Sequence, residues 1–131
     1  MRIKKIDNFY DLEAWECAHQ LTLRIYEITR NFPHDELYGI ISQLRRAATS
    51  VTANIAEGFS RYHFKDKINF YYHARGSVSE VESFFFVARD LHYIRPDQFA
   101  EICQLAISVR RLINGLIKSI DKQLKAPSSD R

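Results

Sequence analysis

The sequence is poor in the residues that mark special chemistry or break helices. It has four glycines, three prolines and two cysteines, and the scattered glycines form no phosphate-cradling loop. The five histidines lie far apart and, like Cys17 and Cys103, fit no zinc-ligand spacing. No apolar run approaches the length of a membrane span. These absences argue against a P-loop nucleotide site, a zinc site, a disulfide-stapled fold and a membrane-spanning protein.

What the sequence does contain fits one cytoplasmic domain. Of its 131 residues 46% are hydrophobic and 27% are charged, so the chain is long enough to bury a single core. Two cysteines at helical positions, without a secretory signal, predict a reducing cytoplasm. The net charge of +3 favours an anionic partner, although only weakly.

Apolar residues at helical spacing recur through almost the whole chain and predict an all-α fold. Short connections between long helices favour antiparallel neighbours, so the expected architecture is an up-down-up-down four-helix bundle. The expected domain spans residues 1–125. Its helices are predicted at about 11–31, 35–59, 65–93 and 96–124, and residues 126–131 are predicted to be a disordered tail.

Local signals set these helix boundaries. Asp11 is the expected N-cap of the first helix, which Pro33 ends. Gly58 is the expected stop of the second helix, and Pro96 fits the first turn of the fourth. Gly76, in the middle of the third helix, costs up to ~1 kcal/mol against alanine, so a neighbour is expected to pack closely on it.

The third predicted helix carries two stripes at three-four spacing. The first contains Phe70, Ala74, Ser77, Val81, Phe84, Ala88 and Leu91, and the second contains Ile68, Tyr72, Arg75, Ser79, Glu82, Phe86, Arg89 and Tyr93. A helix in a small monomeric bundle needs only one apolar face. The second stripe therefore predicts a subunit interface made by Tyr72, Arg75, Glu82, Phe86, Arg89 and Tyr93.

A polar stripe runs along the second predicted helix, turned away from its apolar seam. It consists of Gln43, Ala47, Ser50, Asn54, Glu57 and Arg61. The favoured interpretation is a structural polar network of Gln43, Asn54 and Glu57, in a hydrogen-bonded seam against a neighbouring subunit. The alternative is a strip that faces a ligand or RNA.

The sequence offers little for catalysis or metal binding. Glu16 and His19 form one Glu-x-x-His motif, but a di-iron bundle needs a second copy and the chain has none. Ser77, Ser79 and Glu80 resemble a nucleophile and a base, yet nothing in the sequence activates the serines. We therefore expect no enzymatic activity, no cofactor and no metal.

Basic residues gather in three places: on the second helix, at the connection that follows it, and on the fourth helix. The candidate phosphate contacts are Arg45, Arg46, Arg61, Lys65, Lys67, Arg110, Arg111, Lys118 and Lys122. The alternative is a solvated surface, with cations placed near a helix C-terminus. Tyr62, Tyr71, Tyr72 and Tyr93 are candidates for stacking on bases, against the more usual role of such rings in a core or interface.

Several motifs resemble one known family, the four-helix bundle proteins first associated with intervening sequences in bacterial large-subunit ribosomal RNA genes. The resemblance covers roughly Phe9 to Leu124, and Asn54-Ile55-Ala56-Glu57-Gly58 is its most specific piece. The other matching segments are Phe9-x-x-Leu12-x-x-Trp15, Ile25-Tyr26, Phe32-Pro33 with Glu36 and Gly39, Gln43-Leu44-Arg45-Arg46-Ala47, and Ala74-Arg75-Gly76-Ser77-Val78-Ser79-Glu80.

This resemblance implies a homopentameric ring of antiparallel bundles. It extends to the accessory proteins of diversity-generating retroelements, which are basic pentamers that bind nucleic acid and associate with a reverse transcriptase. One position departs from the pattern, since Thr52 stands where the family often has proline. The second helix is therefore expected to be less kinked there.

Together these observations predict a non-enzymatic, oligomeric nucleic-acid-binding protein, with structured RNA preferred over DNA. The competing hypothesis is a protein-interaction adaptor, for example for a reverse transcriptase, whose contact with nucleic acid is incidental. No membrane partner is expected.

Overall fold

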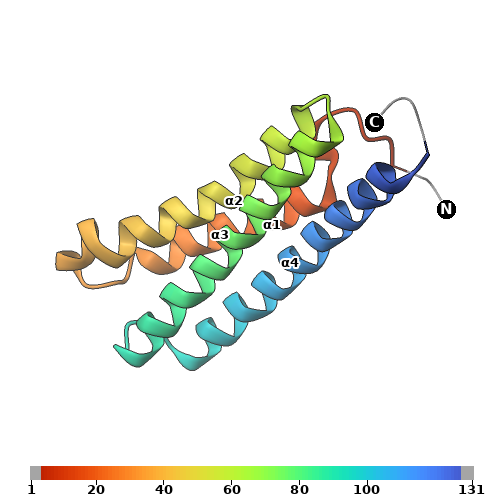
Figure 1. Cartoon of the computed structure of the whole chain (residues 1–131). Coiled ribbons are helices and arrows are strands. Elements are labelled where there is room, and N and C mark those ends of the chain that lie inside the picture. The colour runs from red at the N-terminus through yellow and green to blue at the C-terminus, as the bar shows by residue number, and fades with distance from the viewer. Residues whose placement is uncertain (1–3, 128–131) are drawn as a thin grey trace.

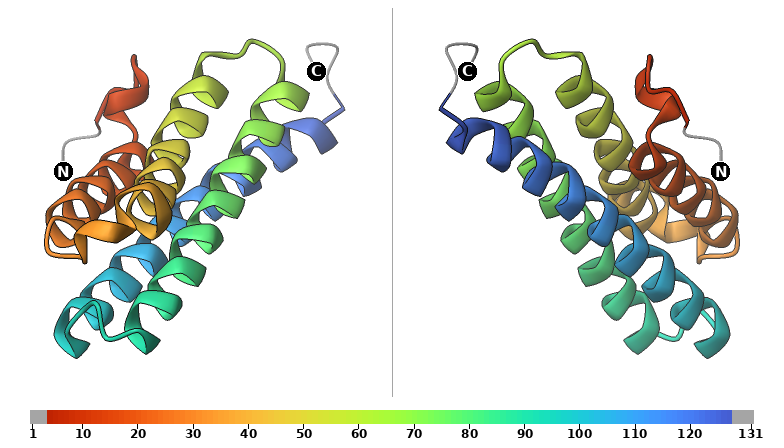
Figure 2. Two further views of the ribbon diagram at one scale, coloured as in Figure 1. Left: turned by 90° about the vertical axis from the view of Figure 1, so that its left-hand side faces the viewer. Right: turned by 90° about the vertical axis from the view of Figure 1, so that its right-hand side faces the viewer.

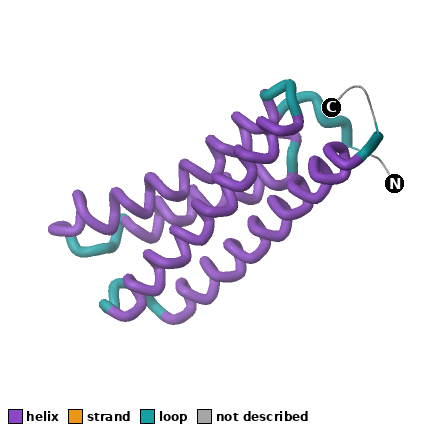
Figure 3. The backbone as a smooth tube through the Cα atoms, in the orientation of Figure 1, coloured by secondary structure: helices purple, strands orange, loops and turns teal. Residues whose placement is uncertain are grey.

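The computed structural model describes residues 4–127, and all regular structure within that range is helical (Figure 3). The four long helices are α1 (Glu13–Thr29), α2 (Ser42–Ser60), α3 (Phe64–Asp90) and α4 (Pro96–Lys125), with short helical turns η1 (Phe9–Asp11), η2 (His34–Glu36) and η3 (Leu37–Ile41). Successive long helices run in opposite directions, and α1 and α3 each pack against α2 and α4 (Figure 1). The prediction of an all-α, four-helix fold is confirmed.

The core lies where the apolar stripes of the four helices meet. On α1 the apolar residues recur at three-four spacing and are buried, as such spacing predicts: Ala14, Ala18, Leu21, Ile25 and Ile28. The other helices add branched aliphatic side chains and one large ring, Phe85 of α3, which is only 1% exposed. Burying each such side chain contributes about 1.5–3 kcal/mol. The fully buried large side chains are Leu21, Ile25, Ile28, Leu44, Val51, Ile55, Val78, Val81, Phe85, Ile102, Val109 and Ile113.

The buried face of α3 includes Ala74, Val81 and Ala88 of the first predicted stripe and is turned from that stripe toward the second. Its centre is formed by Tyr71, Val78 and Phe85, none of which belongs to either stripe. The first stripe contacts α2 through Ser77, and the second contacts α4 through Arg75 and Glu82. The stripes did not include Tyr71, Val78 and Phe85, because three phenylalanines in a row, at residues 84–86, fit several helical registers equally well.

The second helix begins later than predicted. Residues 34–41 form a 3-10 turn and a π-helical turn, because Gly39 leaves helical geometry with φ −107° and ψ −117°. The carboxylate of Glu36 lies close to the Cα of Gly39, so a β-carbon at position 39 would stand 2.5 Å from Glu36 Oε1. The other oxygen, Glu36 Oε2, accepts a hydrogen bond of 2.8 Å from the hydroxyl of Tyr93. The regular α-helix starts at Ser42.

The other helix boundaries differ from the predicted ones by one helical turn or less. The carboxylate of Asp11 accepts backbone hydrogen bonds from Asp7 and Asn8 and closes η1, so α1 begins at Glu13 rather than at Asp11. Helix α4 begins at Pro96, as predicted. It ends at Lys125, where Ala126 is extended. The rest of the predicted disordered tail, residues 128–131, lies outside the described residues.

Two glycines have roles other than those predicted. Gly58 does not stop α2, which continues to Ser60, but it lets α2 approach α3: a β-carbon there would stand 2.7 Å from Cε1 of Tyr71. Around Gly76 a β-carbon would meet nothing within 4 Å, so the close neighbour expected there is not found in the described part of the chain. Helix α2 is continuous through Thr52.

Between residues 4 and 127, no helix combines the length and the hydropathy that crossing a bilayer would require.

Candidate nucleic-acid interface

Two neighbouring candidates on α2, Arg45 and Arg46, are held by the chain itself. The Nε of Arg45 donates to Thr29 Oγ1 at 3.0 Å, and its guanidinium lies 4.7 Å from the ring centre of Tyr26. Arg46 forms an ion pair with Glu80 of α3 and donates to Gln43 Oε1 at 3.1 Å. Both side chains therefore serve packing between helices.

Two candidates near the α2–α3 connection also have partners within the chain. Arg61 pairs with Glu57 at 2.9 Å and lies over the ring of Phe70 at 4.7 Å. The Nζ of Lys67 donates to the carbonyl of Phe59 at 2.7 Å and to that of Gly58 at 3.3 Å, which satisfies the end of α2. Burial lowers the pKa of Lys67.

Arg110 belongs to the contact between α3 and α4. It forms an ion pair with Glu82, and the two side chains are 29% and 23% exposed. Its neighbour Arg111 is exposed. The two adjacent arginines thus differ: Arg110 joins two helices, and Arg111 points to solvent.

Four candidates are exposed and form no ion pair within residues 4–127: Lys65, Arg111, Lys118 and Lys122. The last three follow one another at intervals of seven and four residues, so they share one outward face of α4. The helical rise separates them by about 10 Å and about 6 Å along the axis. We refer to Arg111, Lys118 and Lys122 as the α4 cationic stripe. Lys125 continues it but pairs with Asp121 at 2.9 Å, which raises the pKa of Lys125.

The stripe lies in the more basic half of the bundle. The C-terminal part of α4, the end of α2 and the start of α3 meet at one end, together with the N-terminal segment (Figures 1 and 2). This half, residues 4–20, 50–76 and 108–127, carries eleven Lys or Arg against seven Asp or Glu. The opposite half, residues 21–49 and 77–107, carries six against eight. The excess positive charge is therefore concentrated at the end that presents the stripe.

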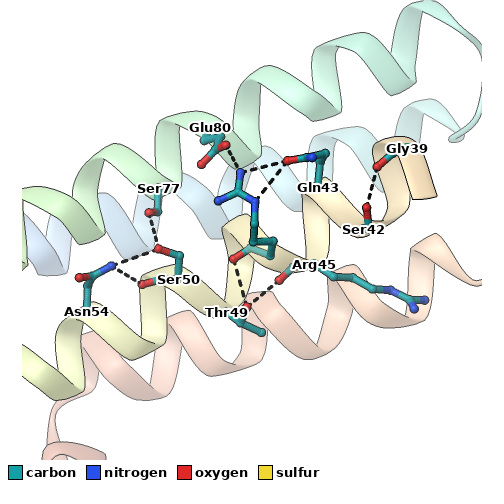
Figure 4. A network of polar contacts seen from close by, with 10 residues as sticks. Gly39, Ser42, Gln43, Arg45, Thr49, Ser50, Asn54, Ser77 and Glu80 are labelled. Atoms are coloured by element: carbon teal, nitrogen blue, oxygen red, sulfur yellow. Dashed lines mark hydrogen bonds and ion pairs between the residues drawn. The ribbon is translucent and has the colours of Figure 1, made fainter. Parts of the chain in front are cut away.

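The polar stripe of α2 faces α3 of the same chain (Figure 4). Arg46 joins Gln43 to Glu80, while the amide of Asn54 donates to Ser50 Oγ at 3.1 Å and Ser50 in turn contacts Ser77 Oγ at 2.9 Å. The third predicted member, Glu57, pairs with Arg61 one turn further along its own helix. Ser77 and Glu80, which resemble a nucleophile and a base in the sequence, are thus contact residues of α2, and no local sequence signal indicates that role.

The predicted subunit-interface residues have contacts inside the chain as well. Arg75 donates to Asn114 at 2.9 Å, and Arg89 lies over the rings of Phe86 and Phe99 at 4.7 and 5.0 Å. Glu82 pairs with Arg110, and Tyr93 with Glu36. Helix α4 thus covers much of the second face of α3. Tyr72 and Phe86 nevertheless remain 43% and 46% exposed.

The residues considered for metal binding are engaged in local contacts. His19 stacks on Trp15, with ring centres 4.7 Å apart, and Glu16 accepts a hydrogen bond from Gln20. Within the range that the structure describes, no three His, Cys, Asp or Glu side chains lie close enough to hold a metal ion.

The sequence profile of the 23S rRNA-intervening sequence protein family matches residues 10–115. The chain belongs to this family. A solved structure of a protein of unknown function from the S23 ribosomal protein family of Bacteroides thetaiotaomicron shares the fold, with a TM-score of 0.72 and 23% identity over 80% of this chain and 98% of that one. A comparison with curated proteins finds no match.

Three of the segments that carry the family resemblance lie where α2 meets α3. Segment 43–47 contains Arg46, which pairs with Glu80 of segment 74–80. Segment 54–58 contains Asn54, which donates to Ser50, and Gly58, which lets α2 approach α3 closely. Segment 74–80 also contains Ser77, which contacts Ser50. In this chain these three segments therefore supply contacts between two helices. The α4 cationic stripe lies outside those segments, so family membership by itself does not assign it a role.

Proposed function

We propose that this protein is a non-enzymatic, oligomeric protein that binds structured RNA through the α4 cationic stripe together with Lys65. The observation that carries the proposal is that these four cations are exposed and without a carboxylate partner in the described residues, while the other five candidates have hydrogen-bond or ion-pair partners within the chain. Phosphates are the natural partners of such a row. The family's association with ribosomal RNA genes makes RNA the first ligand to test.

Two separate apolar patches support the oligomeric part of the proposal. One lies on the α1–α2 side, where Tyr26, Leu37 and Tyr38 are 37%, 37% and 91% exposed. The other, the α3–α4 patch, lies around Phe86 of α3, which is 46% exposed and packs on Phe99 of α4. Contacts between unlike patches are heterologous and form a ring where the rotation between subunits closes, which would suit the homopentamer that the family resemblance implies. A ring would repeat the cationic stripe in every subunit and add avidity.

The test is a salt titration of binding to a structured RNA, a single-stranded RNA and a duplex DNA, with the mass in solution measured on the same sample. The variant Lys118→Glu/Lys122→Glu removes two cations of the stripe. We expect weaker binding and a slope of log K against log salt that is shallower by roughly 1.4–1.8. The matched control is Arg30→Glu/Arg95→Glu, which changes the net charge equally at the opposite end and keeps the wild-type slope.

Two results would contradict the proposal. One is binding that disappears at physiological salt equally for all three nucleic acids, as expected of any basic surface. The other is an unchanged slope in the Lys118→Glu/Lys122→Glu variant.

The second candidate function is a protein-interaction adaptor, for example for a reverse transcriptase. Its specific support is the α3–α4 patch, because partly exposed aromatic side chains beside charged ones are typical of protein interfaces. Capture of a protein partner that survives nuclease and high salt, and that Phe86→Glu abolishes, would favour this function over RNA binding.

A further inference from the structure

The connection between α2 and α3 presents one aromatic ring to solvent. Tyr62 is 88% exposed, and its contact with another ring is an edge contact with the adjacent His63, at 5.1 Å between ring centres. The other tyrosines considered for stacking are engaged elsewhere: Tyr71 is buried, Tyr93 bonds Glu36, and Tyr72 lies against Arg75. Among these four rings, Tyr62 is the one whose face is open.

The backbone on both sides of Tyr62 is held in place. The N–H of Arg61 donates to the carbonyl of Gly58 at 3.3 Å, and the carbonyl of His63 accepts from Asp66 and Lys67 at 3.1 Å. The side chains of Arg61 and Lys67 fix the end of α2 against Phe70 and the carbonyl of Phe59. The exposed ring therefore sits on a short, anchored connection, so little conformational freedom is lost when it binds a flat partner.

Charge near the ring is mixed. Arg61 is balanced by Glu57, and Lys65 lies next to Asp66 in the first turn of α3. Attraction for phosphates comes mainly from the α4 cationic stripe, which runs from Arg111 at the middle of α4 through Lys118 to Lys122, and the C-terminal end of α4 lies at the same end of the bundle as the α2–α3 connection (Figure 1). The connection itself offers chiefly a stacking surface.

We propose that Tyr62 stacks on an unpaired base of the RNA whose phosphates contact Lys65 and the α4 cationic stripe. This inference rests on the proposed function and narrows its ligand to RNA with a single-stranded segment, since a duplex hides the faces of its bases. Stacking on an aromatic ring tolerates any base, so the contact selects unpaired nucleotides rather than a sequence.

The experiment measures fluorescence anisotropy of a labelled unstructured single-stranded RNA and of a duplex RNA of the same length, with the full chain. The variants are Tyr62→Ala, which removes the ring, and Tyr62→Phe, which keeps it. Tyr38→Ala is the matched control, because Tyr38 is 91% exposed at the opposite end of the bundle. We expect Tyr62→Ala to weaken binding of the single strand about ten-fold and to leave duplex binding unchanged. Tyr62→Phe and Tyr38→Ala should bind both RNAs as the wild type does.

Single-strand binding that Tyr62→Ala leaves unchanged, while Lys118→Glu/Lys122→Glu lowers it, would overturn the stacking inference and leave the proposed function standing. Equal weakening by Tyr62→Ala of single strand and duplex would also overturn it, because a duplex offers no base face. A wild-type protein that binds neither RNA would overturn the proposed function and this inference together.

Discussion

Gly58 of α2 lies directly against the ring of Tyr71 of α3, so that a β-carbon at position 58 would stand 2.7 Å from Tyr71 Cε1 and 3.1 Å from the β-carbon of Phe70. Tyr71 is 3% exposed and belongs to the core, so its ring has little room to move away. The close spacing of α2 and α3 therefore requires a residue without a β-carbon at position 58.

Gly58→Ala should destabilise the protein by about 1–2 kcal/mol. Overpacking a core contact costs about 1–3 kcal/mol, and alanine recovers up to ~1 kcal/mol through its higher helix propensity. Chemical denaturation followed by circular dichroism measures the change. The matched control is Gly76→Ala, where the β-carbon meets nothing within 4 Å. That variant should gain about 0.5–1 kcal/mol. Equal effects of the two substitutions would show that the contact with Tyr71 is not limiting.

Tyr71 should make the protein lose stability at high pH. Burial raises the pKa of Tyr71 to about 12, from 10.0 in its ordinary state. Between these values the unfolded chain has released the phenolic proton and the folded chain has kept it, so stability falls as pH rises, by up to ~1.4 kcal/mol per pH unit. The hydrogen bond to Glu36 raises the pKa of Tyr93, so Tyr93 adds to the loss of stability at high pH. The lowered pKa of Lys67 has the opposite effect, because below pH 10.5 the unfolded chain keeps the Lys67 proton that the folded chain has begun to release.

The free energy of unfolding, measured just below pH 10 and again near pH 12, tests this expectation. Tyr71→Phe should remove part of the alkaline loss, and Tyr62→Phe, at an exposed ring, should retain the wild-type loss. A Tyr71→Phe variant that loses as much stability as the wild type would show that the phenol of Tyr71 does not titrate on unfolding.

The ion pair of Arg110 with Glu82 should couple α3 to α4 more strongly than a surface pair does. Both side chains are less than one-third exposed, so solvent screens them only in part. A double-mutant cycle with Arg110→Gln and Glu82→Gln should give a coupling of about 1 kcal/mol. The comparison cycle on Arg95 and Asp97, 67% and 70% exposed, should give a smaller value. A smaller coupling for Arg110–Glu82 would mean that its geometry in solution is looser.

Phe86→Glu should reduce the oligomer to smaller species while helix content is largely kept. Phe86 is 46% exposed in a single chain. In the proposed oligomer a second copy would bury this aromatic side chain, and a buried carboxylate at the same position would be costly. Light scattering after size exclusion measures the mass. Ile6→Glu, at a side chain of 45% exposure on a different segment, is the control and should keep the wild-type mass. Retention of the wild-type mass by Phe86→Glu would remove this residue from the interface.

Much of the fold could be predicted because apolar periodicity directly reports burial in long helices. The apolar seam predicted for the second helix is Leu37, Ile41, Leu44, Ala48, Val51 and Ile55, and all of it is buried except Leu37, which is 37% exposed. The register was harder to predict where several helical registers were equally apolar, as at residues 84–86. The irregular backbone at Gly39 was also not predicted, because the Glu36 carboxylate lies beside Gly39 and accepts a hydrogen bond from the distant Tyr93. A contact between residues 57 positions apart leaves no local signal.

The candidate site was harder to predict, because a list of basic residues does not say which ones the protein uses internally. Arg110 and Arg111 are equivalent in sequence, yet a turn of 100° about the helix axis brings one to Glu82 and the other to solvent. Likewise, nothing local distinguishes Lys67, which satisfies the end of α2, from the exposed Lys65 two residues earlier.

The uneven charge of the two bundle halves has a consequence for encounter kinetics. With eleven cations against seven anions at one end and six against eight at the other, the molecule has an electric dipole along its length. In the field of a polyanion such a dipole experiences a torque that turns the basic end forward before contact. A larger share of collisions would then be productive, and association would slow as added salt shortens the reach of that field.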